Sequence, residues 1–267
     1  MTAPALRLRR APARLRRLGA LRELVLHLAS RELRSSHRRT ALGWSWPLLI
    51  QLVQLAVLSF VFTRIVPLDI DDYPTFVFSG LVFWSWFRGS LTGAATSVTG
   101  NVALVLEPRM PRTVLPLVAL AVATFDLLIA LPVLLTLVGV TGGVHATWAL
   151  LPPVLAVQAV MMAGIGLAVA AAHVYVRDVA QIVGVTLLIL FYVTPVFYPL
   201  DAVPDEHAWI FDINPIAGFI DAYRSILLDG AVPGASLMLG LALASIAVLA
   251  AGWWTFRRLE PGFVDEL

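Results

Sequence analysis

The densest group of side chains that could perform acid–base chemistry lies between residues 201 and 212. It contains four carboxylates and one imidazole: Asp201, Asp205, Glu206, Asp212 and His207. Paired acids can serve as general acid and base when their surroundings separate their pKa values. These residues belong to a polar connecting segment, and no Ser, His and Asp set has a recognisable context. We therefore expect a solvated loop, assign no catalytic residue and do not expect an enzyme.

Nucleotide, metal and thiol chemistry are also disfavoured. The chain has no cysteine, and its five histidines are scattered without HxxxH or HxH spacing, so no metal site is expected. All 19 basic residues are arginine, and no GxxxxGK motif followed by Ser or Thr occurs. Such a chain cannot cradle ATP phosphates itself. We expect no cofactor in this chain, so any energy source must come from a partner.

Two ionisable residues fall near the middle of adjacent apolar stretches, Arg88 and Asp126. A charged side chain at the centre of a bilayer costs about 2.5–3.5 kcal/mol on the translocon scale. Opposite charges at similar depth predict a mutual ion pair. The alternative is that Arg88 faces a conduit and binds sugar hydroxyls or a phosphate. A shifted boundary of the apolar stretch would also explain the two residues.

Aromatic residues are concentrated in two of the apolar stretches. They are Phe83, Trp84, Trp86 and Phe87 in one, and Phe191, Tyr192, Phe197 and Tyr198 in or beside the other. Trp and Tyr favour the membrane–water boundary, so interfacial belts and packing are one interpretation. A path for sugars is the other, because aromatic faces suit the C–H faces of pyranose rings and permit sliding. Trp84, Trp86, Phe87, Arg88, Phe191, Tyr192, Phe197 and Tyr198 are the candidate substrate path.

These residues require long helices to position them. Hydrophobic residues form 59% of the 267-residue chain, and the mean hydropathy is +0.85, which exceeds the soluble-domain average. Stretches of about 20 apolar residues can cross a bilayer, and only helices satisfy their own backbone there. The sequence predicts an all-α membrane protein with six transmembrane helices, near 44–66, 76–98, 114–139, 148–173, 180–199 and 235–256.

The arginines set the expected orientation. The net charge is only +2, yet 11 arginines precede Gly43. With the N-terminus inside, 16 arginines are cytoplasmic, whereas only Arg64 and Arg224 are external. This positive-inside pattern predicts that both termini are cytoplasmic. Nucleic-acid binding is disfavoured, because basic residues beside a span are explained by anionic lipid headgroups.

The segments outside the spans are also predicted to be partly helical. Residues 1–43 form a basic leader and an amphipathic helix that lies in the membrane interface, with Leu21, Leu24, Val25, Leu28, Ala29 and Leu33 on one stripe. That helix is a lipid anchor or a platform for a cytoplasmic partner. Residues 214–229 form an external amphipathic or re-entrant helix that begins at the Asn214 N-cap. Residues 257–267 are a cytoplasmic tail.

The connections contain further polar signals. Residues 100–113 are too polar at their end to stay in lipid, although 102–106 could form a short helix across the membrane face. Asp178 is expected to cap the fifth span. Asp221 and Arg224 form an i,i+3 pair on the external helix.

Several short motifs follow one another in order along the six stretches. They are 31–34 (RELR), 42–46 (LGWSW), 80–84 (GLVFW), Asn101 with Leu104, 110–112 (MPR) with 115–116 (LP), 177–179 (RDV), 195–198 (PVFY), 214–215 (NP) and 223–224 (YR). Their order and spacing resemble those of the membrane subunits of ABC-2 type exporters, specifically the permeases for polysaccharide, O-antigen or teichoic-acid export. Met110 replaces the usual Phe of that family.

The resemblance implies roles for named residues. A separate ATPase would contact three segments: the interfacial helix, the 101–112 loop and the turn between the fourth and fifth spans. The residues assigned to this contact are Arg31, Glu32, Arg34, Asn101, Leu104, Glu107, Arg109, Arg112, Arg177 and Asp178. An external gate would contain Pro195, Asn214, Pro215, Phe219, Tyr223 and Arg224.

It also implies partners and a location. Two copies of the chain would form a homodimer in the bacterial cytoplasmic membrane, among its lipids, with two copies of the ATPase that carries ATP and Mg²⁺. The cargo would be a lipid-linked polysaccharide. An exporter of a drug or lipid, a membrane enzyme acting on polyprenyl lipids and a membrane scaffold are the alternatives.

Overall fold

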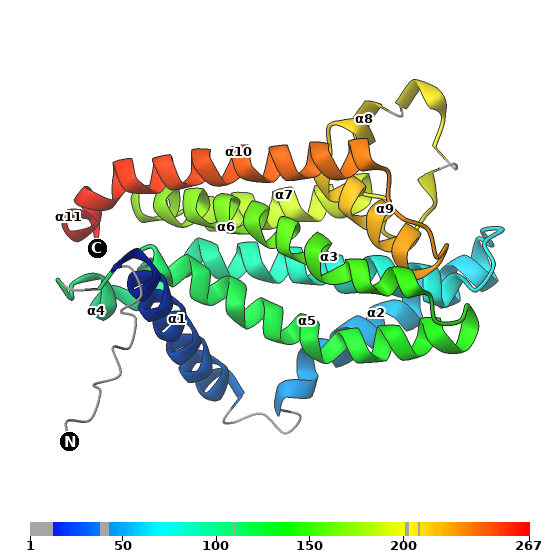
Figure 1. The fold of residues 1–267 in the computed structure, drawn as a ribbon, viewed down its shortest axis with the longest axis horizontal. Helices are drawn as coiled ribbons and strands as arrows, with labels where there is room; N and C mark the ends of the chain where they lie inside the picture. The colour runs from blue at the N-terminus through cyan, green and yellow to red at the C-terminus, as the bar shows by residue number, and fades with distance from the viewer. Residues whose placement is uncertain (1–12, 38–42, 109, 201–202, 208) are drawn as a thin grey trace, which may run out of the picture.

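The computed structural model describes residues 13–37, 43–108, 110–200, 203–207 and 209–267. Within these ranges the regular elements are all helices, and no strand is present. Apart from the helix over 13–37, the longest helices run side by side along the long axis of the molecule (Figure 1). The predicted all-α class is therefore confirmed for the described part of the chain.

Six helical segments correspond to the six predicted spans. They are α2 (Trp46–Phe60) with its flanking turns η1 (Gly43–Ser45) and η2 (Val61–Ile65), α3 (Tyr73–Thr96), α5 (Val114–Thr141), α6 (Leu151–Tyr175) preceded by η4 (Ala146–Leu150), α7 (Val179–Val193) and α10 (Ala235–Leu259). Four segments are long and apolar enough to cross a bilayer: Gly43–Ile65, Val114–Thr141, Ala146–Tyr175 and Ala235–Glu266. α7 is apolar but has only 15 residues, and α3 falls outside the group of four.

The fifth helix is shorter than predicted. It was expected over 180–199, yet α7 ends at Val193. Thr194 is extended, with φ −88° and ψ 136°. The residue before a proline avoids the helical region because the proline ring clashes with its backbone. Pro195 therefore stops the helix at this point, as its position in the sequence indicates.

α3 lies at the centre of the bundle. It packs against α5 and α6 most extensively, and also against α2, α7 and α9. Sixteen of its 24 residues are buried, and the main cluster of buried apolar side chains runs along it. α2 and α7 are peripheral, since each buries only one side chain.

The short elements gather at two ends of the bundle (Figure 1). α4 (Val102–Val105) and α11 (Phe263–Glu266) lie at one end, called here the α4 end. α8 (Trp209–Asp212) and α9 (Pro215–Leu227) lie at the other, called the α9 end. Residues 102–106 were predicted to form a short helix, and α4 confirms this.

α1 (Ala13–His37) crosses the bundle obliquely beside α5 (Figure 1). Ala29 and Leu33 of the predicted apolar stripe are buried, whereas Arg22, Arg31 and Arg34 are exposed. α1 begins at Ala13, within the basic N-terminal segment that was predicted to be a leader, so the helix is longer than expected. Residues 1–12 of that leader lie outside the described residues.

Candidate functional site

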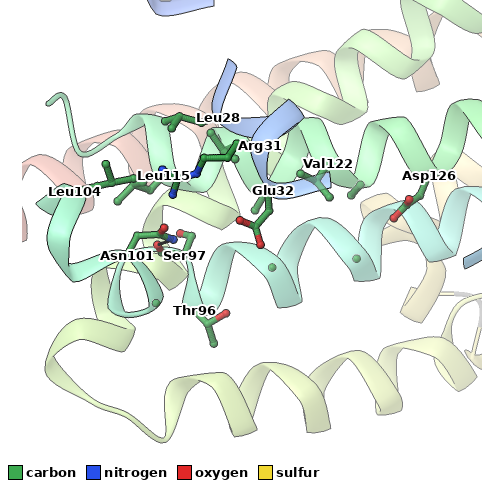
Figure 2. Close-up of a pocket in the computed structure, with 16 residues that line it drawn as sticks. Leu28, Arg31, Glu32, Thr96, Ser97, Asn101, Leu104, Leu115, Val122 and Asp126 are labelled. Carbon is green, nitrogen blue, oxygen red and sulfur yellow. Dashed lines mark hydrogen bonds between the residues drawn. The ribbon is translucent and has the colours of Figure 1, made fainter. Parts of the chain in front are cut away.

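A cavity near the α4 end joins residues from separate parts of the sequence. It has a volume of about 370 Å³ and lies between α1, α3 and α5. Arg31 and Glu32 of α1 line it together with Asn101 and Leu104 beside α4 (Figure 2). The fold thus brings together four of the residues assigned to the ATPase surface.

Asn101 shapes the turn between α3 and α4. Its Nδ2 donates a hydrogen bond to the carbonyl of Ser97 at 2.9 Å. Its own backbone is non-helical, with φ −128° and ψ 44°. A side chain that bonds its local backbone offers the chain an alternative to a continuous helix. Asn101 therefore supports the position of α4 through the backbone.

The other residues assigned to the ATPase surface differ in exposure. Glu107, Arg177 and Asp178 are exposed. Asp178 occupies the N-cap position of α7, yet its side chain makes no capping hydrogen bond, so the predicted cap is wrong. Its exposure leaves the carboxylate in contact with water instead. Arg34 is also exposed, and Arg109 lies outside the described residues.

Arg112 is half-buried and bonds two separate segments. Its Nε donates to the carbonyl of Val105 at 3.1 Å, and its Nη1 donates to the carbonyl of Glu260 at 2.9 Å. One guanidinium therefore joins the end of α4 to the C-terminal end of α10.

Arg88 and Asp126 line a second cavity of about 220 Å³ between α2, α3 and α5. Both side chains are described, and they form no ion pair with each other. The ion pair found among the described side chains joins Arg257 and Glu260, away from this cavity. The predicted Arg88–Asp126 pair is therefore not formed in this protomer. Gln51 lines the same cavity, and its Oε1 is buried without a hydrogen-bond partner.

The candidate substrate-path aromatics divide by burial. Trp84, Trp86 and Phe87 have at most 3% exposure, and Trp86 Nε1 donates to Thr124 Oγ1 at 3.0 Å. Their burial inside one protomer favours the packing interpretation for these three. Tyr192 is 60% exposed on α7.

Tyr192 belongs to a cluster of rings in which Phe197 is the common member. Phe197 contacts Phe191, Tyr192 and Tyr198 at centroid distances of 5.5, 6.0 and 5.0 Å. Tyr198 is half-buried and donates to the carbonyl of Tyr192 at 3.1 Å. The segment after α7 is thus folded back against the end of that helix.

Arg224 anchors this segment at the α9 end. Its two terminal nitrogens donate to the carbonyls of Pro195 and Val196, each at 2.7 Å, and its guanidinium lies 3.7 Å from the centre of the Phe76 ring. The i,i+3 pair with Asp221 is not formed among the described side chains. Two fixed carbonyls suit the planar fork of an arginine, so the guanidinium turns toward them.

The charge of Arg224 persists at neutral pH. Burial lowers the pKa of the Arg224 guanidinium to about 9, and the carboxylates of Asp221 and Asp229 oppose this shift. The group therefore acts as a half-buried cation that holds main-chain carbonyls. It also lines a cavity of about 500 Å³ with Asn214 and Asp221.

Asn214 caps α9, as the sequence predicted. Its Oδ1 accepts from the N–H of Ile216 at 3.1 Å, and its Nδ2 donates to Thr194 Oγ1 at 3.0 Å. Pro215 follows in the first turn, where its missing N–H costs nothing. The same amide thus starts α9 and ties it to the end of α7.

Tyr223 fixes the other side of α9. Its hydroxyl donates to Gln158 Oε1 of α6 at 2.7 Å, and its ring stacks on Phe83 with centroids 3.7 Å apart. Phe219 is fully buried beside it. All six residues assigned to the external gate therefore lie in or around α9 and the segment that precedes α8.

Sequence reasoning missed the partners of these residues. Gln158 lies in an apolar stretch, where an isolated amide is itself a signal that a hydrogen-bond partner exists. Thr194 and Val196 carried no comparable signal. The acidic segment next to α8 is only partly described: Glu206 and His207 are exposed, whereas Asp201 and the side chains of Asp205 and Asp212 lie outside the described residues.

A model of the ABC-2 type transporter family matches residues 23–228. The chain belongs to the ABC-2 type transporter family. The matched region runs from α1 to the end of α9, so it contains both cavities around α3 and the residues bonded to Arg224.

Characterised proteins are similar over almost the whole chain. The O-antigen export system permease protein RfbA of Myxococcus xanthus is 30% identical over 94% of this chain and 98% of its own length. A protein of the same name from Klebsiella pneumoniae is 25% identical over 94% and 97%. The polysialic acid transport protein KpsM of Escherichia coli is 21% identical over 88% and 93%.

Proposed function

We propose that this chain is the membrane-spanning subunit of an exporter that moves a lipid-linked polysaccharide outward across the bacterial cytoplasmic membrane. The observation that carries the proposal is the similarity, over 94% of the chain, to permeases named for O-antigen export. Polysialic acid, named for a third relative, is chemically different from O-antigen. The shared feature is a long glycan, and this is the substrate class we assign.

Six spans and a cytoplasmic α4 end are part of the proposal. α3 and α7 would join the four strongly apolar segments as spans, which gives an even number. The arginine bias supports an orientation in which α1, the α4 loop and the α6–α7 turn would lie inside the cell. α1 would lie in the inner membrane interface with its buried stripe against α5.

A separate ATPase would bind at the α4 end. The sequence contains no phosphate-cradling motif of its own, and exposed charges of three segments are available there: Arg31 on α1, Glu107 after α4 and Arg177 after α6. Two ATPase copies would serve a homodimer of this chain. Movements driven by ATP would then pass along α3, which connects this end to the buried α9.

The homodimer would cover exposed apolar helix faces. On α2, Val53, Val57 and Phe60 have exposures of 55%, 57% and 61%, and on α7 Leu188 and Tyr192 are each 60% exposed. These faces require lipid or a second copy of the chain. A conduit between two copies would place Tyr192 on the path of the glycan, whereas the buried Trp84 would support the path from behind.

Purification of the tagged chain from its bacterium in mild detergent tests the proposal. We expect a P-loop ATPase to co-purify in constant ratio with the wild type. Glu107→Arg should lower its retention about tenfold, equivalent to 1.4 kcal/mol. Glu206→Arg is the matched control, because Glu206 is an exposed glutamate at the opposite end.

Two outcomes would contradict the proposal. The first is a purified chain with no ATPase bound under conditions that preserve its fold. The second is a deletion strain that still displays its full amount of long surface glycan.

A further inference from the structure

The last eight residues turn back onto the bundle at the α4 end. After α10, the short turn η7 (Glu260–Gly262) leads into α11, and we call residues 260–267 the C-terminal hook. Phe263 in the hook has 0% exposure. Its ring contacts Phe256 of α10 edge-on, with centroids 5.3 Å apart. The hook is therefore attached through a buried side chain.

Phe263 belongs to a second cluster of buried apolar residues at the α4 end. This cluster joins the ends of α5, α6 and α10 to Val98, which follows α3, and to Val105 at the end of α4. This cluster is separate from the large core along α3. Phe263 thus shares a buried cluster with residues of both connections at the α4 end, and the main core along α3 is formed without it.

Hydrogen bonds tie the same two loops to the C-terminal end of α10. Tyr175, at the end of α6, donates its hydroxyl proton to the carbonyl of Leu259 at 2.7 Å. Arg112, after α4, donates to the carbonyl of Glu260 at 2.9 Å. The last carbonyls of a helix have no partners within it and favour cations. Arg112 and Tyr175 supply those partners.

The contact between the hook and Tyr175 is close. A Cβ atom on Gly262 would collide with the Tyr175 hydroxyl. Tyr175 and Phe263 also have ring centroids 6.3 Å apart. A glycine at this position therefore lets the chain pass directly over the tyrosine before Phe263 enters its pocket.

We propose that the C-terminal hook positions the α4 loop and the α6–α7 turn relative to each other for the partner ATPase. The proposal rests on the proposed function for the identity of that partner. Glu107 and Arg177 lie on the two connected segments and are exposed. A partner that contacts both needs them at a fixed separation, and the cluster around Phe263 provides that constraint together with the hydrogen bonds of Arg112 and Tyr175.

The arrangement distinguishes positioning from general stability. In α11, Phe263 is the buried residue, whereas Val264, Asp265 and Glu266 are exposed. Loss of the Phe263 ring should therefore free the two loops while the helices along α3 keep their packing. Phe263→Leu retains an apolar side chain and should restore most of the constraint.

A distance measurement between spin labels tests the positioning directly and needs no ATPase. The chain has no cysteine, so Glu107→Cys and Arg177→Cys provide two unique labelling sites. We expect Phe263→Ala to broaden the distance distribution between them, and Phe263→Leu to keep it narrow. Val264→Ala is the matched control, because Val264 is 46% exposed in the same short helix.

Unlabelled variants then report the consequence for the partner. Phe263→Ala should lower ATPase retention about tenfold in permease that still folds and is recovered in the wild-type amount, and Phe263→Leu should restore the retention. An unchanged label distribution in Phe263→Ala overturns the proposal. A loss of folded permease that matches the loss of ATPase also overturns it, because the residue would then be needed for the whole bundle.

The two proposals fail in different ways. If the wild type itself binds no ATPase, the proposed function fails, and the label distances still decide whether the hook fixes the loops. If the wild type binds its ATPase and Phe263→Ala binds equally well, only the role of the hook is wrong.

Discussion

The α9 end and the α4 end both contain irregular chain between long helices, yet they hold it differently. At the α9 end, the buried Asn214 and Tyr223 and the half-buried Arg224 connect α9 to α6 and to the segment after α7. At the α4 end, Arg31, Glu107 and Arg177 are exposed. Among the described residues, Arg112, Tyr175 and Phe263 tie segments of this end together.

The difference separates two kinds of polar residue in a membrane protein. Non-helical backbone at membrane depth is tolerated where protein side chains satisfy it. Arg224 satisfies two non-helical carbonyls at the α9 end, so its loss should destabilise the fold. Exposed residues at the α4 end have no such task, so their substitution should alter partner binding with little effect on stability.

Arg224→Ala should give the largest effect. It removes two charged hydrogen bonds to buried carbonyls, each worth about 1.5–3 kcal/mol. We expect a large fall in melting temperature in detergent and little protein in the membrane. Arg224→Lys should recover only part of the lost stability, because lysine keeps the positive charge but lacks the planar guanidinium that donates to both carbonyls. Arg64 is an exposed arginine after α2, so Arg64→Ala is the control. Equal melting temperatures of the two alanine variants would refute the idea that Arg224 holds the segment after α7 in place.

Gly80→Ala should be the next most damaging change at the α9 end. A Cβ on Gly80 would lie 2.7 Å from the carbonyl oxygen of Val196, which Arg224 also holds. Overpacking of this kind costs about 1–3 kcal/mol, measured as a lower melting temperature. Gly240→Ala in α10 is the control, because a Cβ there meets nothing within 4 Å. No difference between the two variants would mean that the segment after α7 moves freely.

Tyr223→Phe should have a moderate effect. It leaves Gln158 Oε1 buried without its donor, which costs about 1–3 kcal/mol. Gln158→Leu in the same chain removes the stranded acceptor and should recover most of the stability. Thermal melting of the two single variants and the double variant measures the coupling. Additive losses would show that the hydrogen bond contributes nothing specific.

Arg31→Ala should have the smallest effect on stability. The residue is exposed on α1 and lines the larger α4-end cavity, and surface substitutions usually stay within about 0.5 kcal/mol. We expect unchanged melting together with reduced ATPase retention in a pull-down. A clear loss of stability here would remove the distinction between the two ends.

Much of the local structure could be predicted from the sequence. The α9 N-cap follows from Asn214-Pro215, because an amide acceptor and a fixed φ are local properties. The stop of α7 follows from Pro195 in the same way. The length of that helix was overestimated because apolar character continues past the proline, whereas backbone geometry does not.

The candidate sites were predicted less completely. Arg88 and Asp126 share a cavity, as their depths indicated, yet they form no ion pair with each other among the described side chains. The pair was predicted wrongly because the sequence indicates the depth of a residue in its helix and leaves the direction of its side chain open. Trp84 and Trp86 were ambiguous for the same reason. Their burial became visible only when α5, α6 and α7 were placed around α3.

The sequence by itself determined the helices, their apolar character and the separation of an arginine-rich end from an acidic one, because these depend on composition and on neighbours within a few positions. Tertiary structure decided the partners. Arg224 reaches Val196 from 28 positions away, Tyr223 reaches Gln158 across 65, and Arg112 reaches Glu260 across 148. Such contacts depend on how helices pack, and no local pattern specifies them. The contacts of the C-terminal hook around Phe263 therefore follow from the folded chain and could not be predicted from the sequence.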